Sequence, residues 1–273
     1  MKIALLQMTS GVDPLANART IVDAVAEAAR SGAAMLFTPE MSGLIDQNRK
    51  RAAASLHAEG DDPVLAATRT AAREHGIWVH LGSLAVHGND GRLANRAFVI
   101  DDAGEIRARY DKLHLFDVDL PSGESWRESA AYAPGANAVV VDTPVGALGL
   151  SICYDLRFAA LFAALSDAGA TVLATPAAFT PPTGAAHWHV LQRARAIESA
   201  AYVVSAAQAG THEDGRATYG HSVVIDPWGT VLLDMGEAAG LGFADIDPAR
   251  IADVRARVPV IAHRRPIPEV STT

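Results

Sequence analysis

The sequence of 273 residues has one cysteine, fewer basic than acidic residues, and no apolar run of the about 18 residues that a membrane-spanning helix needs. A single cysteine, Cys153, excludes an internal disulfide and a thiolate cluster for zinc. The net charge of −8 argues against nucleic acid or an anionic membrane as the main partner, because both attract clustered Lys and Arg. We therefore expect a partner that is neither nucleic acid nor membrane.

Glycine-rich phosphate-binding motifs are also missing. Neither G-x-x-x-x-G-K-[ST] nor G-x-G-x-x-G occurs at a strand-to-helix junction, so nothing supports nucleotide binding and we expect no cofactor. The first eight residues, MKIALLQM, hold too short an apolar stretch for a signal peptide and are typical of a β-strand. We expect the protein to act in the cytoplasm.

Apolar residues make up 49% of the sequence, which excludes a disordered chain and is enough for a large core. Helical periodicity after Asp13-Pro14 predicts a helix that ends at Gly32, with Leu15, Ala18, Val22, Val25 and Ala29 on its apolar face. The same pattern predicts a second helix from Asp62-Pro63 to Gly76. The expected strands are residues 2–8, 34–38, 77–84, 92–100, 139–152, 171–175, 202–208 and 222–226.

The order of these elements indicates an α/β fold in which parallel and antiparallel pairs share one sheet system. Hairpin turns are expected at 89–91 and 102–104. Residues 31–40 (SGAAMLFTPE) resemble residues 168–177 (AGATVLATPA), which indicates two packed α/β halves. Without a linker between them, we expect one domain over 1–273, with a loose C-terminal tail at 258–273.

Three residues able to do chemistry follow predicted strands. Glu40 follows the strand expected at 34–38, Lys112 follows a further β-like run at 106–110, and Cys153 follows the apolar run that ends at 152. Ligands of α/β sheets bind at such strand ends. Taken singly, the cysteine is also typical of a small buried apolar residue, and the two charges of a surface. Cys153 leads into a predicted helix over 156–162, whose N-terminus would favour a thiolate. For Asp155 and Arg157 we expect helix capping and a local ion pair.

Ten histidines leave a Cys–His pair open as an alternative. His187 and His189 have a metal-like spacing, but residues i and i+2 of a helix point to different faces, and no third ligand is near in sequence. We therefore expect no metal site.

Several ordered segments resemble the nitrilase (carbon–nitrogen hydrolase) superfamily, over about residues 2–266. They are residues 37–40 (FTPE), 110–116 (YDKLHLF), 149–158 (GLSICYDLRF), 183–188 (TGAAHW), 193–198 (RARAIE) and 219–229 (YGHSVVIDPWG). The most similar branch is that of deaminated glutathione amidase and omega-amidase, through residues 114–121 and 187–229, with the former favoured.

This resemblance implies a four-layer α-β-β-α sandwich of two mixed sheets with outer helices, forming a homodimer or a higher homo-oligomer. It implies a catalytic triad of Glu40, Lys112 and Cys153 and a second glutamate at Glu128. The backbone N–H of Tyr154 would stabilise an oxyanion, and His187 and Trp188 would line the site.

The implied reaction is hydrolysis of the terminal primary amide of a small metabolite, through a thioester, to a carboxylate and ammonia. Deaminated glutathione is the favoured substrate. Omega-amidase activity on α-ketoglutaramate, nitrilase or N-carbamoyl amidohydrolase activity, and a non-enzymatic binding role are the alternatives. The substrate would depend on loops 179–184 and 210–218, and which arginine meets a substrate carboxylate stays open.

Reference pKa values for Glu and Cys differ by about 4 units, so unaided proton transfer from thiol to carboxylate would cost roughly 6 kcal/mol. We expect Lys112 and the helix N-terminus to close part of this gap by lowering the pKa of the thiol.

Overall fold

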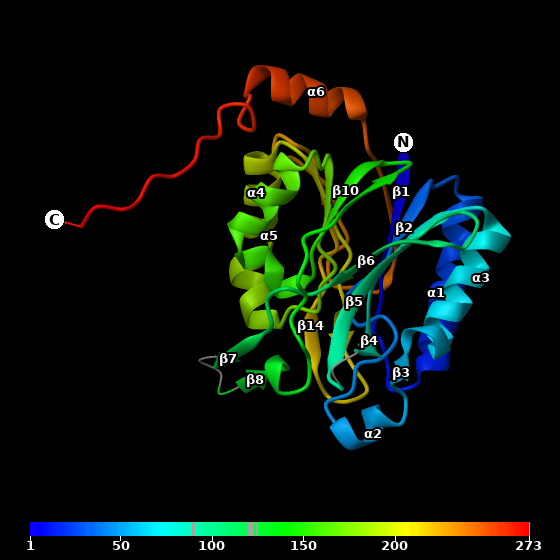
Figure 1. Ribbon diagram of the computed structural model, residues 1–273. Helices are drawn as coiled ribbons and strands as arrows, with labels where there is room; N and C mark the ends of the chain where they lie inside the picture. Colours follow the sequence, from blue (N-terminus) through cyan, green and yellow to red (C-terminus); the bar gives the residue numbers. More distant parts are fainter. Residues whose placement is uncertain (89–90, 120–122, 124, 273) are drawn as a thin grey trace.

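Two mixed β-sheets lie face to face between two pairs of helices in the computed structural model, which describes residues 1–88, 91–119, 123 and 125–272 (Figure 1). Helices α1 (Pro14–Arg30) and α3 (Pro63–His75) cover one sheet. Helices α4 (Ala159–Asp167) and α5 (Pro181–Ser199) cover the other. The expected four-layer α-β-β-α sandwich is confirmed.

The first sheet has three parallel strands in the middle and antiparallel strands on both sides. Its order is β17-β1-β2-β4-β5-β6, with β3 paired to β4. The parallel strands are β1 (Lys2–Gln7), β2 (Met35–Phe37) and β4 (Trp78–His87). Strand β3 (His57–Ala58) also pairs parallel to β4, whereas β5 (Leu93–Ile100), β6 (Ile106–Asp111) and β17 (Gly240–Asp245) are antiparallel to their neighbours.

The second sheet repeats this pattern, with the order β9-β10-β11-β12-β15-β16. Strands β10 (Gly146–Leu150), β11 (Val172–Ala174) and β12 (Tyr202–Ser205) are parallel. Strands β9 (Val140–Thr143), β15 (Val223–Ile225) and β16 (Val231–Asp234) are antiparallel to their neighbours. Because β2 and β11 hold the same place in the two sheets, the predicted two halves are confirmed.

The prediction of one strand over 139–152 is wrong, because β9 and β10 form a hairpin there. Pro144 follows β9, and Gly146 has a φ of 121°, a conformation that reverses the chain at low cost only for glycine. The turn at 102–104 is confirmed by the hydrogen bond from Gly104 N to Asp101 O. Of the turn predicted at 89–91, Asn89 and Asp90 lie outside the described residues.

The smaller elements lie around this frame. They are α2 (Arg49–Ala53), α6 (Pro248–Arg257), the ribbons β7 (Asp117–Asp119) with β8 (Ser125–Arg127) and β13 (Ala209–Thr211) with β14 (Ala217–Tyr219), and the 3-10 turns η1 (Glu59–Asp61), η2 (Glu128–Ala130) and η3 (Cys153–Arg157). Beyond α6, residues 265–272 have no regular secondary structure and extend away from the body (Figure 1).

The two aspartates at which the predicted helices begin both act as N-caps. Asp13 accepts a hydrogen bond from Leu15 N at the start of α1, and Asp62 accepts one from Leu65 N at the start of α3. The predicted apolar face of α1 is partly wrong. Leu15 is 55% exposed, whereas Ile21 and Ala28 are fully buried, so the buried face is rotated from the expected one.

Alternating side chains of the first sheet serve two cores. Ile3 and Leu5 of β1 face the second sheet, while Ala4 and Leu6 face α1 and α3. Because both faces are buried, the strands read as continuous apolar runs. Among the described helices, none has both the length and the hydropathy required to cross a bilayer.

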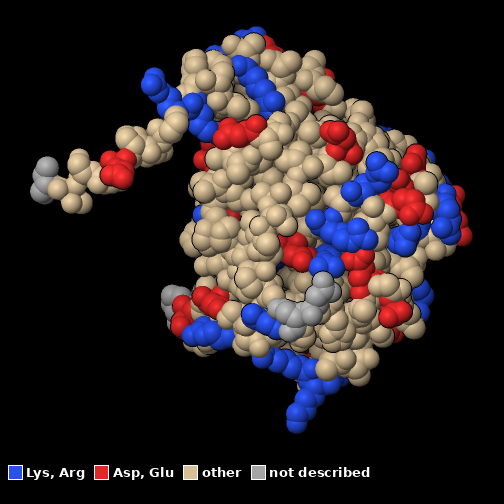
Figure 2. Space-filling model, in the orientation of Figure 1, with Lys and Arg blue, Asp and Glu red and all other residues tan. Residues whose placement is uncertain are grey.

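Charged side chains of opposite sign are intermixed on the surface. Figure 2 shows Lys and Arg next to Asp and Glu over much of one face of the molecule. On the sheet surface of β5 and β6, Arg96 pairs with Asp111 at 2.6 Å and with Glu59 at 2.9 Å, and Arg109 also pairs with Glu59. The basic residues of this surface are therefore neutralised by carboxylates.

Gly82, in the middle of β4, lies tightly against residues of both halves. A Cβ atom here would lie 2.1 Å from the carbonyl oxygen of Thr38, 2.5 Å from that of Pro39 and 2.6 Å from the Cβ of Pro176. Two of these atoms belong to backbone, which cannot yield as a flexible side chain does. Gly82 thus sets the position of the segment that leads to Glu40.

We expect Gly82→Ala to lower the free energy of unfolding by about 1–3 kcal/mol, because the added methyl overpacks this contact. Urea denaturation measures the change. Gly60→Ala is the matched control, since nothing lies within 4 Å of a Cβ there, and it should stay within about 0.5 kcal/mol of the wild type. Equal stability of the two variants would contradict the close approach.

Candidate active site

Glu40 lies two residues beyond the Thr38 that follows β2, and its side chain points into the space between the sheets. It is 5% exposed. Its Oε1 accepts hydrogen bonds from Lys112 Nζ at 2.9 Å and Asn95 Nδ2 at 3.0 Å, and its Oε2 accepts one from Ala178 N at 3.0 Å. These three donors hold the carboxylate in one orientation.

Lys112 follows β6 and is 2% exposed. Its Nζ lies 2.9 Å from both Glu40 Oε1 and Glu128 Oε2, so one ammonium joins two carboxylates. Burial alone would lower the pKa of Lys112, but Glu128 and Glu40 outweigh it and hold that pKa well above its usual value. Lys112 is therefore a permanent cation in this site.

Glu128, at the start of η2, occupies the other side of Lys112. Its Oε2 also accepts a hydrogen bond from Phe116 N at 2.7 Å, which fixes the loop that follows Lys112. The structure thus brings Glu128 beside Glu40 and Lys112, although the three are far apart in the sequence.

Asn95 is a site residue that the sequence reasoning missed. Its Nδ2 donates to both Glu40 and Glu128, at 3.0 and 3.1 Å. Its backbone carbonyl oxygen accepts a hydrogen bond from Lys112 N. An amide in a strand made mostly of apolar residues was the signal that could have revealed it, because a buried polar group needs partners.

Cys153 begins η3 directly after β10 and Ile152. It has a φ of 50°, a rare value for a residue other than glycine, and its N–H donates to Pro176 O at 2.9 Å. The thiol is buried, and the Glu40 carboxylate, Lys112 and the N–H of Ala178 are near enough to influence its pKa. A nucleophile on such a sharp strand-to-turn corner is exposed toward its partners rather than packed along the strand.

Two expectations about this cysteine are wrong. The α-helix begins at Ala159, after the 3-10 turn, so the N-terminus of a long helix does not adjoin the sulfur. Burial, reinforced by the Glu40 carboxylate, raises the pKa of the Cys153 thiol well above its usual value, and Lys112 opposes this only in part. The charge of Lys112 is already shared by two carboxylates, and the raised pKa favours the neutral thiol at Cys153.

Asp155 acts as the anchor of the nucleophile turn rather than as a partner of Arg157. It caps η3 by accepting from Ile152 N at 2.9 Å, as expected. It also accepts from Tyr110 Oη at 2.6 Å and contacts His114 through N and Nδ1, at 3.0 and 2.7 Å. The expected ion pair is replaced: Arg157 lies 3.3 Å from His187 Nδ1 instead.

The three further residues assigned to the site lie in different surroundings. Tyr154 directly follows the nucleophile, and its ring lies edge-on to Phe116 and Phe158. His187 is exposed on α5. Trp188 is fully buried, and its indole donates to His221 O at 2.7 Å. Trp188 thus supports the wall behind the site as a core residue.

Arg216, in the loop 210–218, is a second residue that the sequence reasoning did not single out. Its guanidinium lies 4.7 Å above the Trp126 ring and 3.7 Å from Asp214, and its Nε has no hydrogen-bond partner among the described residues. Burial lowers the pKa of Arg216, while Asp214 and Glu40 oppose that shift. A largely buried cation with an unused donor, within electrostatic range of Glu40, is suited to an anionic group.

Comparisons with known proteins identify the family of this chain. Residues 2–256 match the carbon-nitrogen hydrolase family. Deaminated glutathione amidase from Rattus norvegicus is 42% identical over 97% of this chain and 82% of its own length. The protein of that name from Yersinia enterocolitica is 38% identical over 96% of this chain and 92% of its own length.

Solved structures show the same architecture. The NitFhit protein of C. elegans superposes with a TM-score of 0.90 at 40% identity over 97% of this chain, which spans 65% of that protein. Nit3 of Saccharomyces cerevisiae, a nitrilase-superfamily member, superposes with a TM-score of 0.86 at 26% identity, covering 97% of this chain and 96% of that one. With the family match running through nearly the whole sequence, the chain belongs to the carbon-nitrogen hydrolase family, within the nitrilase superfamily.

Proposed function

We propose that the protein is a cysteine-dependent amidase that cleaves deaminated glutathione, with Glu40, Lys112 and Cys153 as its catalytic triad. The observation that carries this proposal is the buried contact of one thiol, one ammonium and one carboxylate at the ends of strands from both halves. Relatives about 40% identical over nearly the whole chain bear the name of that activity, which supports the substrate.

The first step is attack of Cys153 Sγ on the amide carbon. Because the resting thiol is neutral, its proton passes to Glu40 as the C–S bond forms. Negative charge then develops on the carbonyl oxygen, where Lys112 Nζ and the N–H of Tyr154 stabilise it. Glu128 and Asn95 position Lys112 and Glu40 for these roles.

The second half of the reaction releases the amine and then the acid. Glu40 returns its proton to the leaving nitrogen as the C–N bond breaks, leaving a thioester on Cys153. Glu40 then takes a proton from water, the hydroxyl oxygen attacks the thioester carbon, and the thiol is re-formed with the carboxylic acid product. An amidase from Nesterenkonia sp., 30% identical, has been solved with acrylamide added to its active-site cysteine, which supports this nucleophile.

The chemistry of this substrate changes the expected leaving group. In deaminated glutathione the bond to be cleaved joins the 2-oxoacid to the nitrogen of cysteinylglycine, so the product amine is that dipeptide. Ammonia would be released only from a primary amide such as α-ketoglutaramate. Both compounds carry a carboxylate, for which Arg216 beside Trp126 offers a charge-assisted hydrogen bond.

The remaining parts of the proposal concern the state of the protein. The family match over residues 2–256 supports a single carbon–nitrogen hydrolase domain. A catalytic thiol must stay reduced, which supports action in the cytoplasm. Resemblance to the superfamily supports a homodimer or higher homo-oligomer, and residues His187 and Trp188 are proposed to shape the wall of the substrate site.

Cys153→Ala should abolish hydrolysis, to less than about 1% of wild-type turnover, because no second nucleophile is available. The assay measures cysteinylglycine from deaminated glutathione and ammonia from α-ketoglutaramate, N-carbamoyl amino acids and simple nitriles. Circular dichroism checks that the variant is folded. Residual turnover well above that level would remove the nucleophile assignment, and release from nitriles alone would replace the substrate class.

The pH dependence of alkylation tests the role of Glu40. In the wild type, the rate of Cys153 carboxamidomethylation by iodoacetamide should keep rising above the pH at which an ordinary thiol is half ionised, because the thiol pKa is raised. Glu40→Gln removes the neighbouring negative charge, favours the thiolate, and should shift the profile downward by about 1 unit or more.

Glu74→Gln, on the exposed part of α3, is the matched control and should leave the profile in place. An unchanged or upward-shifted profile in Glu40→Gln would show that this carboxylate does not face the sulfur.

Arg216→Gln tests the anion site. Loss of a charge-assisted hydrogen bond, about 1.5–3 kcal/mol, should raise KM for deaminated glutathione by roughly 10- to 100-fold with a smaller change in kcat. Turnover of a short neutral amide should change little, and Arg216→Lys should recover part of the loss. An equal loss with charged and neutral amides would mean that Arg216 only supports the loop.

A further inference from the structure

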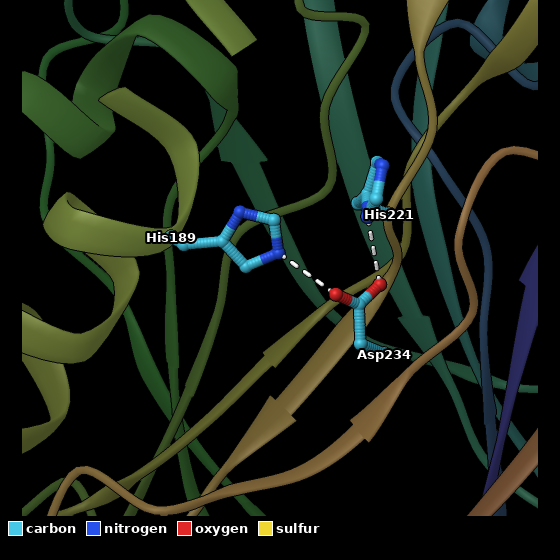
Figure 3. Close-up of side chains that lie close together, drawn as sticks. All are labelled: His189, His221 and Asp234. Carbon is cyan, nitrogen blue, oxygen red and sulfur yellow. Dashed lines mark hydrogen bonds and ion pairs between the residues drawn. The ribbon is translucent and has the colours of Figure 1, made fainter. Parts of the chain in front are cut away.

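A second group of polar side chains lies apart from the triad, at the junction of α5 with the second sheet. His189 comes from the middle of α5, His221 from the loop between β14 and β15, and Asp234 from the end of β16 (Figure 3). The three ligand atoms, one from each side chain, lie within 4.8 Å of one another. Sequence reasoning considered His189 only with its near neighbours and missed partners that are 32 and 45 positions away.

Both imidazoles point at the same carboxylate. His189 Nε2 lies 2.9 Å from Asp234 Oδ2, and His221 Nδ1 lies 2.9 Å from Asp234 Oδ1 (Figure 3). The two rings are 5.2 Å apart and nearly perpendicular, at 81°. The side chains are 32%, 21% and 34% exposed, in the order His189, His221, Asp234, so the group is open on one side.

The surrounding structure holds these side chains in place. His221 has a φ of 56°, and its backbone is fixed by hydrogen bonds from its N–H to Gly236 O and from the Trp188 indole to its carbonyl oxygen. Its ring stacks on Tyr219 at 4.4 Å. Gly236 N donates to Asp234 Oδ1 at 2.9 Å. His221 is a non-glycine residue in a costly backbone conformation, and its ring is held by stacking on one side. Such strain is typical of functional sites.

This arrangement meets the chemical requirements of a transition-metal site. Two imidazole nitrogens and one carboxylate oxygen are ligands typical of Zn²⁺ and related ions, and are unlike the all-oxygen sets that Mg²⁺ and Ca²⁺ prefer. Ligand atoms around tetrahedral zinc lie about 3.3 Å apart, which small side-chain rotations would reach from the present positions. Each neutral imidazole would move its proton to its other ring nitrogen and offer a lone pair.

We propose that His189, His221 and Asp234 bind one divalent transition-metal ion, with Zn²⁺ as the first choice and water completing the coordination. The ion would tie α5 to the β14–β15 loop and β16, which otherwise meet through hydrogen bonds. Because Trp188 and Tyr219 belong to the same junction, metal binding stabilises the wall behind Phe179 without entering the catalytic chemistry.

Calorimetric titration of the chelator-treated protein with ZnCl₂ tests the proposal. We expect one Zn²⁺ per chain and a rise in Tm on binding. His189→Ala and Asp234→Asn should each weaken the affinity at least about tenfold and remove the Tm rise, since the loss even of an outer-shell partner commonly costs 10- to 100-fold. Asp234→Asn keeps the shape of the side chain and is therefore the variant more certain to fold. The Tm of each variant is also measured without metal, to check that it is folded.

Two further variants separate this site from two other side chains that could bind zinc, His187 and Cys153. His187→Ala removes an exposed histidine two positions from His189 and should bind Zn²⁺ as the wild type does. Cys153→Ala removes the thiol and should also retain stoichiometry and affinity. The proposal is overturned if the wild type takes up no Zn²⁺, if binding is lost with Cys153, or if His189→Ala and Asp234→Asn bind as tightly as His187→Ala.

Discussion

The interaction on which the rest of this structure depends is one buried ammonium between two carboxylates, Glu40 and Glu128, whose side chains are 6% and 12% exposed. Lys112 neutralises one of the two negative charges of Glu40 and Glu128, so the site holds a net negative charge. Burying these groups is costly unless every atom is paired, and the amide of Asn95 and the N–H groups of Phe116 and Ala178 supply the missing partners. Burial and the Glu40 carboxylate raise the pKa of the neighbouring Cys153 thiol, which favours its protonated form.

The fold places this charge arrangement where the two halves meet. Glu40 and Lys112 follow strands of the first sheet, and Cys153 follows a strand of the second. Parallel strands at the centre of each sheet present their carboxyl ends at one place, and the face-to-face packing brings the two sets together. Gly82 leaves room for the backbone of Thr38 and Pro39, which leads to Glu40, and for Pro176 of the second half. The site is therefore a product of the sheet-to-sheet contact and would not exist in one half alone.

Local sequence patterns were sufficient to predict much of the fold and of the site. Asp13 and Asp62 mark the helix starts, and Glu40, Lys112 and Cys153 could be singled out because each follows an apolar strand. What could not be predicted depends on neighbours in space. The buried face of α1 depends on the angle at which it meets the sheet, so Leu15 was misplaced. The direction of the thiol pKa depends on burial and on the charge balance of three other residues.

Asn95 and Arg216 also could not be predicted from local patterns. Each is a single polar residue with no motif around it, and its importance appears only when its contacts are known. His189 is a further case, because the partners that give it meaning come from a loop and a strand far along the chain.

The repeated strand-Thr-Pro segment has a consequence for how the two halves share the site. Where the first repeat carries Glu40, the second carries Ala177, which is fully buried. The next residue of the second repeat, Ala178, gives its N–H to Glu40 Oε2. The first copy thus supplies the carboxylate, and the second supplies the N–H that binds it. The two halves have similar folds but unequal parts in the site, because the position of Glu40 in the first copy is held by Ala177, with only a methyl group, in the second.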